Sequence, residues 1–357
     1  MSVLESRNII DPGKDLQIRP EQVLVAIPTL NEARHIERCL RSLMESDPFC
    51  DRVLFAVADG GSTDETRTIV ETLTQTHSNL VLLDNPDVLQ SAGINRVVAE
   101  LAGPDHVILV RCDAHAQYPS GYVRRIVETF ADHPDAASVA GVLDARGDNG
   151  FQRASAWAVD TRLGSGGSAH RGGTRSGWVD HGHHAGFRLD WFRRLGGYDP
   201  SFSHNEDAEY DHRLGQANGR LWLEGQLRTD YVMRPTPRAL WIQYWRYGKG
   251  RARTVMKHRM RPRARQIAPA LLLVLQLCCL VAAPFWPPAL GLPVAYLAML
   301  AATSVVAAVR LQSVCGLWAG VALFIIHNAW GAGFIRGLAQ GLAQGSARGL
   351  TGGAGRQ

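Results

Sequence analysis

The sequence predicts a mainly parallel, doubly wound α/β sheet, followed by interfacial amphipathic helices and then by transmembrane helices. Two observations lead to this prediction. Short β-rich runs alternate with helix-like stretches in the first part of the chain, which is the order of a parallel sheet covered on both faces. From residue 267 onward, three long apolar stretches follow with few charges. The expected segments are an N-terminal extension (1–20), the α/β domain (21–235), a basic aromatic segment (236–265), a transmembrane region (266–336) and a glycine-rich tail (337–357).

The first four strands and the helices between them follow from hydrophobic periodicity. The first helix opens at Asn31 and Glu32 and places Ile36, Leu40 and Leu43 on one face. The predicted strands are residues 23–28, 53–58, 79–83 and 107–110, and the next two helices are residues 62–73 and 90–101.

Polar residues follow three of these strands, at residues 28–32, 59–61 and 113–115. Ligands of doubly wound sheets bind beyond the carboxyl ends of the strands, so the three stretches are expected to line one cleft. A structural alternative exists for each stretch, such as Asn31 capping the next helix or residues 60–61 forming a tight turn. Asp59 and Asp113 fit that alternative less well, because a carboxylate at the end of a buried strand is costly unless it is paired.

The fingerprints of common nucleotide sites are missing from the sequence. No GxGxxG follows the first strand and no GxxxxGK[ST] occurs, which argues against a dinucleotide site and a P-loop. A phosphate group in this cleft would need another source of positive charge. Asp113 and His115 are suitable ligands for a divalent cation, either Mg²⁺ or Mn²⁺.

The three apolar stretches, residues 267–286, 288–309 and 314–334, are each about as long as a membrane span, which needs roughly 20 residues. The alternative is a hydrophobic helical domain of a soluble protein, but a chain of this size offers little to bury three such helices. Residues 238–265 contain ten Lys or Arg and no Asp or Glu. The positive-inside rule therefore predicts a multi-pass protein of the inner (cytoplasmic) membrane, with the α/β domain in the cytoplasm.

Aromatic residues accompany the positive charges before the first apolar stretch. Trp241, Tyr244, Trp245 and Tyr247 recur at helical spacing, as expected of a helix in the headgroup layer. A nucleic-acid patch is the alternative, and the adjoining membrane stretch argues against it. We therefore expect contact with membrane lipid and none with nucleic acid.

Several ordered motifs resemble those of the family 2 inverting glycosyltransferases. They are "IPTLNE" (27–32), "ADGGSTDET" (58–66), "CDAHAQYP" (112–119) and "GGYDPSFSHNEDAEYDHRL" (196–214). The resemblance covers residues 21–250 and implies a GT-A fold and a nucleotide-sugar donor. "GGSAHRGG" (166–173), "VDHGHHAGF" (179–187) and the C-terminal spans are similar to a membrane-bound subgroup that makes succinoglycan.

The resemblance assigns roles to individual residues of the donor site. Asp59 would meet the nucleotide base, and Asp113 is similar to the first carboxylate of the family's Asp-x-Asp metal motif. His115 stands where the family has the second carboxylate, so the resemblance implies Asp113 as the first metal ligand and His115 as the second. The remaining nucleotide-sugar contacts implied by the resemblance are Pro28, Leu30, Glu32, Gly61 and Asn95.

The acidic stretch at residues 206–209 has a structural and a chemical interpretation. Acids in the first turn of a helix each stabilise it by a few tenths of a kcal/mol up to about 1 kcal/mol. The resemblance instead makes Asp207 the general base that takes the proton of the acceptor hydroxyl, with Glu206 orienting it. Of two adjacent carboxyls, one has a raised pKa. Arg246, in a segment similar to the family's QxxRW, is implied as a phosphate contact, and Lys249 and His183 are expected near the acceptor or diphosphate.

The expected activity is a metal-dependent, inverting hexosyl transfer. One sugar, glucose from UDP-glucose, would move in β linkage to a polyprenyl-diphosphate-linked saccharide for exopolysaccharide assembly. One alternative is a polyprenyl-phosphate glycosyltransferase, whose acceptor is the lipid phosphate itself. Another is a non-catalytic binding subunit of a polysaccharide assembly complex, but the presence of Asp59, Asp113 and Asp207 favours an enzyme.

Overall fold

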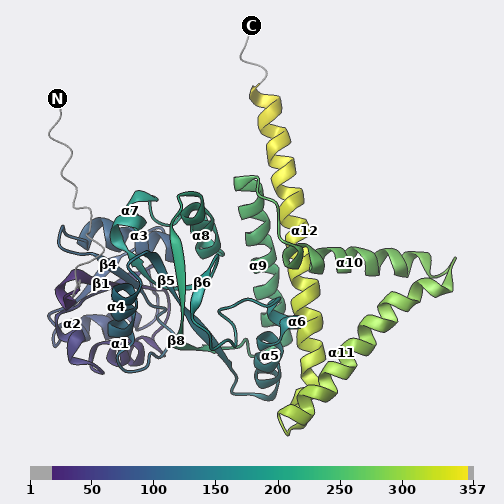
Figure 1. Cartoon of the computed structure of the whole chain (residues 1–357), viewed down its shortest axis with the longest axis horizontal. Helices are drawn as coiled ribbons and strands as arrows, with labels where there is room; N and C mark the ends of the chain where they lie inside the picture. Colours follow the sequence, from purple (N-terminus) through teal and green to yellow (C-terminus); the bar gives the residue numbers. More distant parts are fainter. Residues whose placement is uncertain (1–17, 353–357) are drawn as a thin grey trace.

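The computed structural model describes residues 18–352 as an α/β domain joined to a group of long helices (Figure 1). The strands are β1 Val23–Thr29, β2 Leu54–Asp59, β3 Leu80–Asp84, β4 Ile108–Arg111, β5 Ala136–Arg146, β6 Gly177–Val179, β7 His183–Arg188 and β8 Arg220–Val232. The helices are α1 Ile36–Met44, α2 Thr66–Thr74, α3 Gln90–Leu101, α4 Tyr122–Asp132, α5 Gly150–Asp160, α6 Arg162–Ser165, α7 Leu189–Arg194, α8 Glu206–Gln216, α9 Pro237–His258, α10 Ala264–Ala282, α11 Gly291–Arg310 and α12 Trp318–Gly352.

The strands form one eight-stranded sheet in the order β3-β2-β1-β4-β7-β5-β8-β6. The four predicted strands β1 to β4 pair in parallel, and β5 pairs in parallel with β8. The prediction of a mainly parallel sheet is confirmed. β7 runs antiparallel between β4 and β5, with Val110 opposite Gly186. Because of this register, the residues that begin β7 lie beside the carboxyl end of β4.

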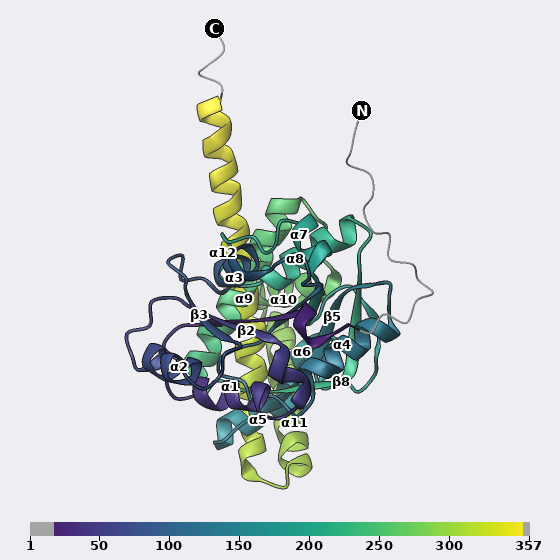
Figure 2. The same ribbon diagram turned by 90° about the vertical axis from the view of Figure 1, so that its left-hand side faces the viewer.

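Helices cover both faces of the sheet, as a doubly wound fold requires. Alternate residues of β1 point to opposite faces. Val23, Val25 and Ile27 pack against α1 and α4. Leu24 and Ala26 pack on the other face, against α3, α7 and α8. Figure 2 shows the sheet seen from the side opposite the long helices, with α1 and α2 toward the viewer. The two cores fix the strand ends, where the predicted cleft residues lie.

The basic aromatic segment forms the single helix α9, which lies beside α12 (Figure 1). Glycines allow the two backbones to approach closely. A Cβ on Gly248 would lie 2.1 Å from the carbonyl oxygen of Trp330, and one on Gly333 would lie 2.2 Å from that of Trp245. Small residues at such contacts are typical of membrane helix pairs. α9 also contacts the α/β domain, because Asn205 Nδ2 donates to the carbonyl of Tyr247 at 2.8 Å.

Three helical segments are long and apolar enough to cross a membrane: Ala264–Ala282, Pro287–Arg310 and Val314–Ala343, with mean hydropathies of 1.8, 2.0 and 1.4. α10 and α11 form a hairpin that projects away from the α/β domain (Figure 1). Their apolar side chains are largely exposed, as expected of surfaces that face lipid. α12 differs because it packs against α9 and α5, and it continues past the expected segment boundary at residue 336 to Gly352.

Candidate active site

The loop after β2 is built around the buried carboxylate of Asp59. This carboxylate accepts hydrogen bonds from the backbone N–H groups of Gly61 and Ser62, at 3.2 and 3.1 Å, and from Arg67 Nη1 at 3.1 Å. The Ser62 hydroxyl donates to it as well, so the cost of burying the charge is offset within the loop. α2 therefore begins at Thr66, later than predicted, because residues 61–64 belong to this loop. Contact between Asp59 and a nucleotide base stays a prediction.

The end of β1 is tied to this loop and to the end of β4. Asn31 Oδ1 accepts a hydrogen bond from the backbone N–H of Thr63 at 2.8 Å, and Ser62 Oγ accepts one from the N–H of Asn31 at the same distance. Glu32 Oε1 lies 3.3 Å from His115 Nδ1. The three strand ends thus lie together at one edge of the sheet, as predicted from the parallel strands. Pro28 and Glu32 are half-buried there, and the side chain of Leu30 is exposed.

Asn95 has its hydrogen-bonding capacity engaged elsewhere. Its side-chain amide donates to the carbonyl of Tyr198 at 2.7 Å and accepts from the N–H of Tyr198 at 2.9 Å. These bonds fasten α3 to the loop that precedes α8. Its predicted place near the nucleoside is not tested by these contacts, but they show a structural role that the sequence did not indicate.

Asp113 lies just beyond β4, among groups that favour its charged form. Its Oδ1 accepts from Gln90 Nε2 at 3.1 Å, and its Oδ2 lies 3.6 Å from His183 Nε2. Arg111 Nη2 lies 3.6 Å from Oδ1. Burial alone would raise the pKa of Asp113, but Arg111, His183 and His115 outweigh it and hold the pKa below its usual value. His183 reaches this position because β7 runs antiparallel to β4.

The buried guanidinium of Arg111 connects β4 to the start of α8. Its Nη2 also lies 3.5 Å from Glu206 Oε1. Burial raises the pKa of Glu206 above its usual value; the positive charge of Arg111 opposes this rise, and the negative charge of Asp207 adds to it. The raised pKa expected for one of two adjacent carboxyls therefore falls on Glu206 rather than on Asp207.

A chain of hydrogen bonds holds Arg111 in place. Arg111 Nη1 donates to the hydroxyl of Tyr198 at 3.2 Å, and that hydroxyl lies 2.6 Å from His184 Nδ1. His184 Nε2 lies 2.6 Å from Asp211 Oδ1. A carboxylate only accepts hydrogen bonds, so His184 donates to Asp211 through Nε2. His181 Nδ1 contacts the second oxygen of Asp211 at 2.7 Å.

Asp207, the predicted general base, is half-buried at the start of α8. Within residues 18–352, its carboxylate accepts one hydrogen bond, from the backbone N–H of Ala208 at 2.7 Å. Burial acts to raise its pKa, but the charges of His181, His184 and Arg111 outweigh burial and hold the pKa below its usual value. Asp207 is therefore an ionised carboxylate with free acceptor capacity at neutral pH, which is the state that a general base needs.

The sequence did not indicate the hydrogen-bond chain formed by Arg111, Tyr198, His184 and Asp211. A charged Arg111 at the end of the apolar run "VILV" was the available signal, because a buried guanidinium needs acidic partners. Tyr198 and Asp211 lie inside the quoted motif at residues 196–214, but nothing in the one-dimensional pattern pairs them with His184. Their partnership depends on the antiparallel strand β7.

The geometry around Asp113 suits one divalent cation, although the described residues contain no cluster of three or more His, Cys, Asp or Glu arranged as a metal site. An oxygen and a nitrogen 3.6 Å apart, those of Asp113 and His183, are close enough to contact the same ion at bonds of about 2.1 Å. Mg²⁺ sites commonly use one or two protein ligands, with substrate phosphates and water completing the shell. His115 Nδ1 lies 3.3 Å from Glu32 Oε1, an arrangement that metal-ligating histidines commonly show, so His115 stays a predicted ligand beside His183.

Comparisons with known proteins identify the family and the fold. Residues 24–196 match the model of "Glycosyl transferase family 2". The chain is 43% identical over 318 residues to the succinoglycan biosynthesis protein ExoA of Rhizobium meliloti (strain 1021), covering 88% of this chain and 94% of that protein. It is 23% identical over 244 residues to a dolichyl N-acetyl-α-D-glucosaminyl phosphate 3-β-D-2,3-diacetamido-2,3-dideoxy-β-D-glucuronosyltransferase of Methanococcus voltae, covering 66% of this chain and 74% of that protein.

Among solved structures, the fold is similar to that of the mannosyltransferase PcManGT from Pyrobaculum calidifontis, determined with GDP-mannose and Mn²⁺. The TM-score is 0.56 at 21% identity, and the match covers 90% of this chain and 88% of the mannosyltransferase. This likeness confirms the predicted GT-A fold. The family model and the identity to ExoA show that the chain belongs to glycosyltransferase family 2, a family of inverting enzymes, and the three candidate spans indicate a membrane protein.

Proposed function

We propose that this enzyme transfers one glucose from UDP-glucose, with inversion to a β linkage, onto a polyprenyl-diphosphate-linked saccharide. The reaction would take place at the cytoplasmic face of the inner membrane, during exopolysaccharide assembly. The 43% identity to a succinoglycan biosynthesis protein supports the pathway class. The observation that carries the proposal is the position of Asp207, an ionised carboxylate at the start of α8, where Asn205 contacts Tyr247 of α9 at 2.8 Å.

The proposed chemistry divides between two groups of residues. Asp113 and His183 would hold a divalent cation, Mg²⁺ or Mn²⁺, and this cation would neutralise the diphosphate of the donor. The Mn²⁺ in the complex of the structurally similar mannosyltransferase supports this assignment. Asp207 would take the proton of the attacking acceptor hydroxyl, and Glu206 would be held beside it by Arg111. Direct attack at the anomeric carbon accounts for inversion.

The donor contacts predicted from the sequence remain part of the proposal. Pro28, Leu30 and Glu32 would line the nucleoside site, with Asp59 and Gly61 from the neighbouring loop. Gly61 has a φ of +83°, and a Cβ added to it would meet no atom within 4 Å, so the ligand side of this turn is open. Asn95 would contribute indirectly, because its hydrogen bond to Tyr198 holds the loop before α8 in place.

Arg246 and Lys249 are proposed to attract the acceptor diphosphate at the membrane surface. Both side chains are exposed on α9, the helix that links the α/β domain to α12. Burial lowers the pKa of His204, and the charges of Arg246 and Arg234 lower it further. Arg246 therefore lies within electrostatic reach of the loop before α8. Basic residues at this position also support a cytoplasmic orientation.

A polyprenyl-phosphate glycosyltransferase is the second candidate function. The Methanococcus voltae relative is named for transfer to a sugar on a dolichyl phosphate, which favours a sugar acceptor over a bare lipid phosphate. A donor panel tests both candidates. The purified chain is incubated with nucleotide sugars and a lipid-linked monosaccharide, and the mass of the lipid product is determined by mass spectrometry. The proposal expects a hexose added to the sugar with release of uridine diphosphate. Transfer to polyprenyl phosphate alone would support the second candidate.

A further inference from the structure

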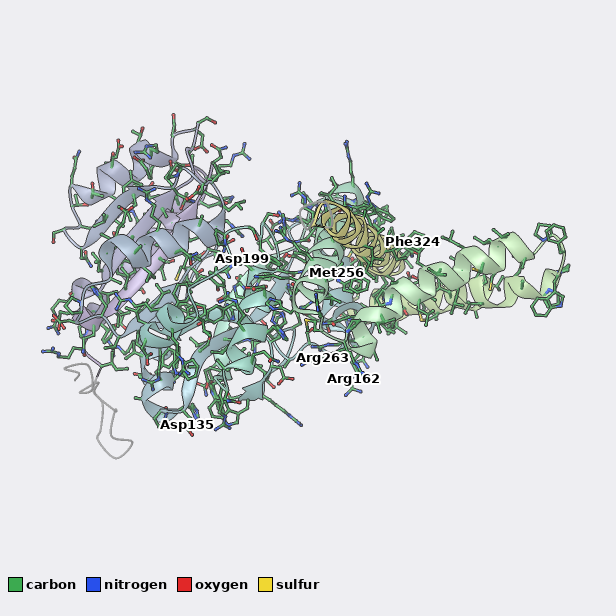
Figure 3. All side chains as sticks on the ribbon, turned by 90° about the horizontal axis from the view of Figure 1, so that it is seen from above. Asp135, Arg162, Asp199, Met256, Arg263 and Phe324 are labelled. Carbon is green, nitrogen blue, oxygen red and sulfur yellow. The ribbon has the colours of Figure 1, made fainter. Side chains whose placement is uncertain are left out.

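A cavity of about 370 Å³ lies between α8, β6 and the segment that joins α9 to α10. Its lining includes Arg251 of α9 and Arg263 and Arg265 near the start of α10. Figure 3 shows Arg263 at the junction between the α/β domain and the group of long helices. The opposite wall contains His181 and Asp211, which belong to the hydrogen-bond chain beside Asp207.

Four arginines line this cavity together with Asp180 and Asp211, and one of the four, Arg220, pairs with Asp135 at 3.4 Å. Within residues 18–352, neither Arg251 nor Arg265 makes a hydrogen bond or an ion pair with another side chain. Arg263 contacts Asp180 at 2.8 Å, across an exposed pair of side chains that water screens. Arg251 is half-buried, and Arg263 and Arg265 lie at the more exposed rim. Three guanidinium groups around one cavity therefore offer donors for an anion.

Electrostatics links the cavity to the predicted base. Burial lowers the pKa of Arg251, with Arg265 and Arg263 adding to the fall, whereas the charges of Asp207 and Asp211 oppose it. Arg251 thus lies within the electrostatic reach of both carboxylates. Asp211 lines the cavity and lies about one helical turn after Asp207 on α8, so an anion held in the cavity would lie close to the predicted base.

The sheet order separates this cavity from the donor site. The loops that border the predicted nucleoside site follow β1 and β2, and β6 lies at the far edge beyond β4, β7, β5 and β8. The donor diphosphate is proposed to bind at Asp113 after β4, so it does not account for the cavity. The rim, in contrast, is continuous with α10, which begins at Ala264 and is the first candidate membrane span. An anion carried by a membrane lipid reaches the rim at headgroup depth.

We propose that Arg251, Arg263 and Arg265 bind the diphosphate of the lipid-linked acceptor in this cavity. The proposal rests on the proposed function for the class of acceptor. Guanidinium groups bind phosphate oxygens in pairs, which a lysine does not reproduce. A diphosphate held here leaves the attached saccharide to extend along His181 toward Asp207, and the polyprenyl chain to follow α10 into the bilayer.

Direct lipid binding tests the proposal independently of sugar transfer. The full chain in nanodiscs is titrated with polyprenyl diphosphate, with polyprenyl alcohol and phosphatidylglycerol as competing probes. We expect Arg251→Gln and Arg265→Gln each to weaken diphosphate binding about tenfold, the effect of losing a charge-assisted hydrogen bond. Arg251→Lys should restore only part of the affinity. Arg261→Gln is the matched control, because Arg261 is exposed in the same segment and does not line the cavity.

Several results would overturn the inference. Unchanged binding in both cavity variants, or equal competition by phosphatidylglycerol, would show that the cavity does not select a lipid diphosphate. A loss confined to Arg246→Lys would place the diphosphate elsewhere on α9. A raised KM for UDP-glucose with unchanged lipid binding would assign the cavity to the nucleotide. Wild-type protein that binds polyprenyl diphosphate but transfers no sugar would instead refute the proposed function and leave the cavity assignment standing.

Discussion

The contact between α9 and α12 predicts the effect of adding a single methyl group. In Gly248→Ala, the new Cβ would lie 2.1 Å from the carbonyl oxygen of Trp330, whereas an unstrained contact needs about 3.5 Å. The helices would have to separate by more than about 1 Å, since both clashing groups are close to rigid backbone. Overpacking of this kind costs about 1–3 kcal/mol. Because both groups are rigid backbone, the cost lies at the upper end of this range, and alanine regains up to about 1 kcal/mol of helix propensity, so the net loss is about 2 kcal/mol.

Thermal unfolding of the purified chain in one fixed detergent measures this loss. Each kcal/mol shifts Tm by about 2–4 °C in domains of 150–250 residues, so Gly248→Ala should lower Tm by a few degrees. Gly215→Ala is the control. This glycine is also helical, but no atom lies within 4 Å of its added Cβ, and the change should leave Tm equal or higher. If both variants had the same Tm as the wild type, the close packing of α9 on α12 would be wrong.

Two further predictions concern the site. Asp113→Ala and His183→Ala should both abolish cation-dependent binding of UDP-glucose, measured by calorimetry with and without EDTA. His115→Ala should weaken this binding less. A larger loss for His115→Ala than for His183→Ala would identify His115 as the second metal ligand. Asp211→Asn should cost about 2 kcal/mol at pH 7, since burial is outweighed by His184 and His181 and the pKa of Asp211 falls to about 2. Because this folded-state pKa lies below the unfolded value, the stabilisation is present above about pH 4 and lost as the pH falls toward 2. Unfolding curves of the two proteins should therefore converge over that range, and a gap independent of pH would contradict the assignment.

The arrangement of β1, β2, β3 and β4 follows from sequence because each strand is a local hydrophobic run with a helix after it. The acidic residues at the strand ends were singled out for another reason: burying a carboxylate without a partner is unfavourable. For Asp59, the partners prove to be its own loop and Arg67, so a correct argument about cost did not reveal what offsets it.

The rest of the site depends on pairings between distant segments. β7 is a short strand whose antiparallel place between β4 and β5 brings His183 to Asp113 and His184 to Tyr198, and no local pattern encodes that placement. The same holds for the cavity at Arg251 and Arg265, which are 14 positions apart on two helices. The sequence indicated an interfacial helix from the aromatic and basic residues, but which arginines face a cavity follows only from the packing of α9.

The role of Asp207 is the central claim, and one variant tests it most directly. Asp207→Asn keeps the size of the side chain and removes the proton acceptor. Glucose transfer to the lipid-linked saccharide should fall at least about a hundredfold, which is the low end of general-base contributions, while UDP-glucose affinity stays within about threefold. Transfer and donor binding are measured on the same preparation, by product mass spectrometry and calorimetry. Retention of a tenth or more of the wild-type turnover, with donor binding intact, would contradict the account.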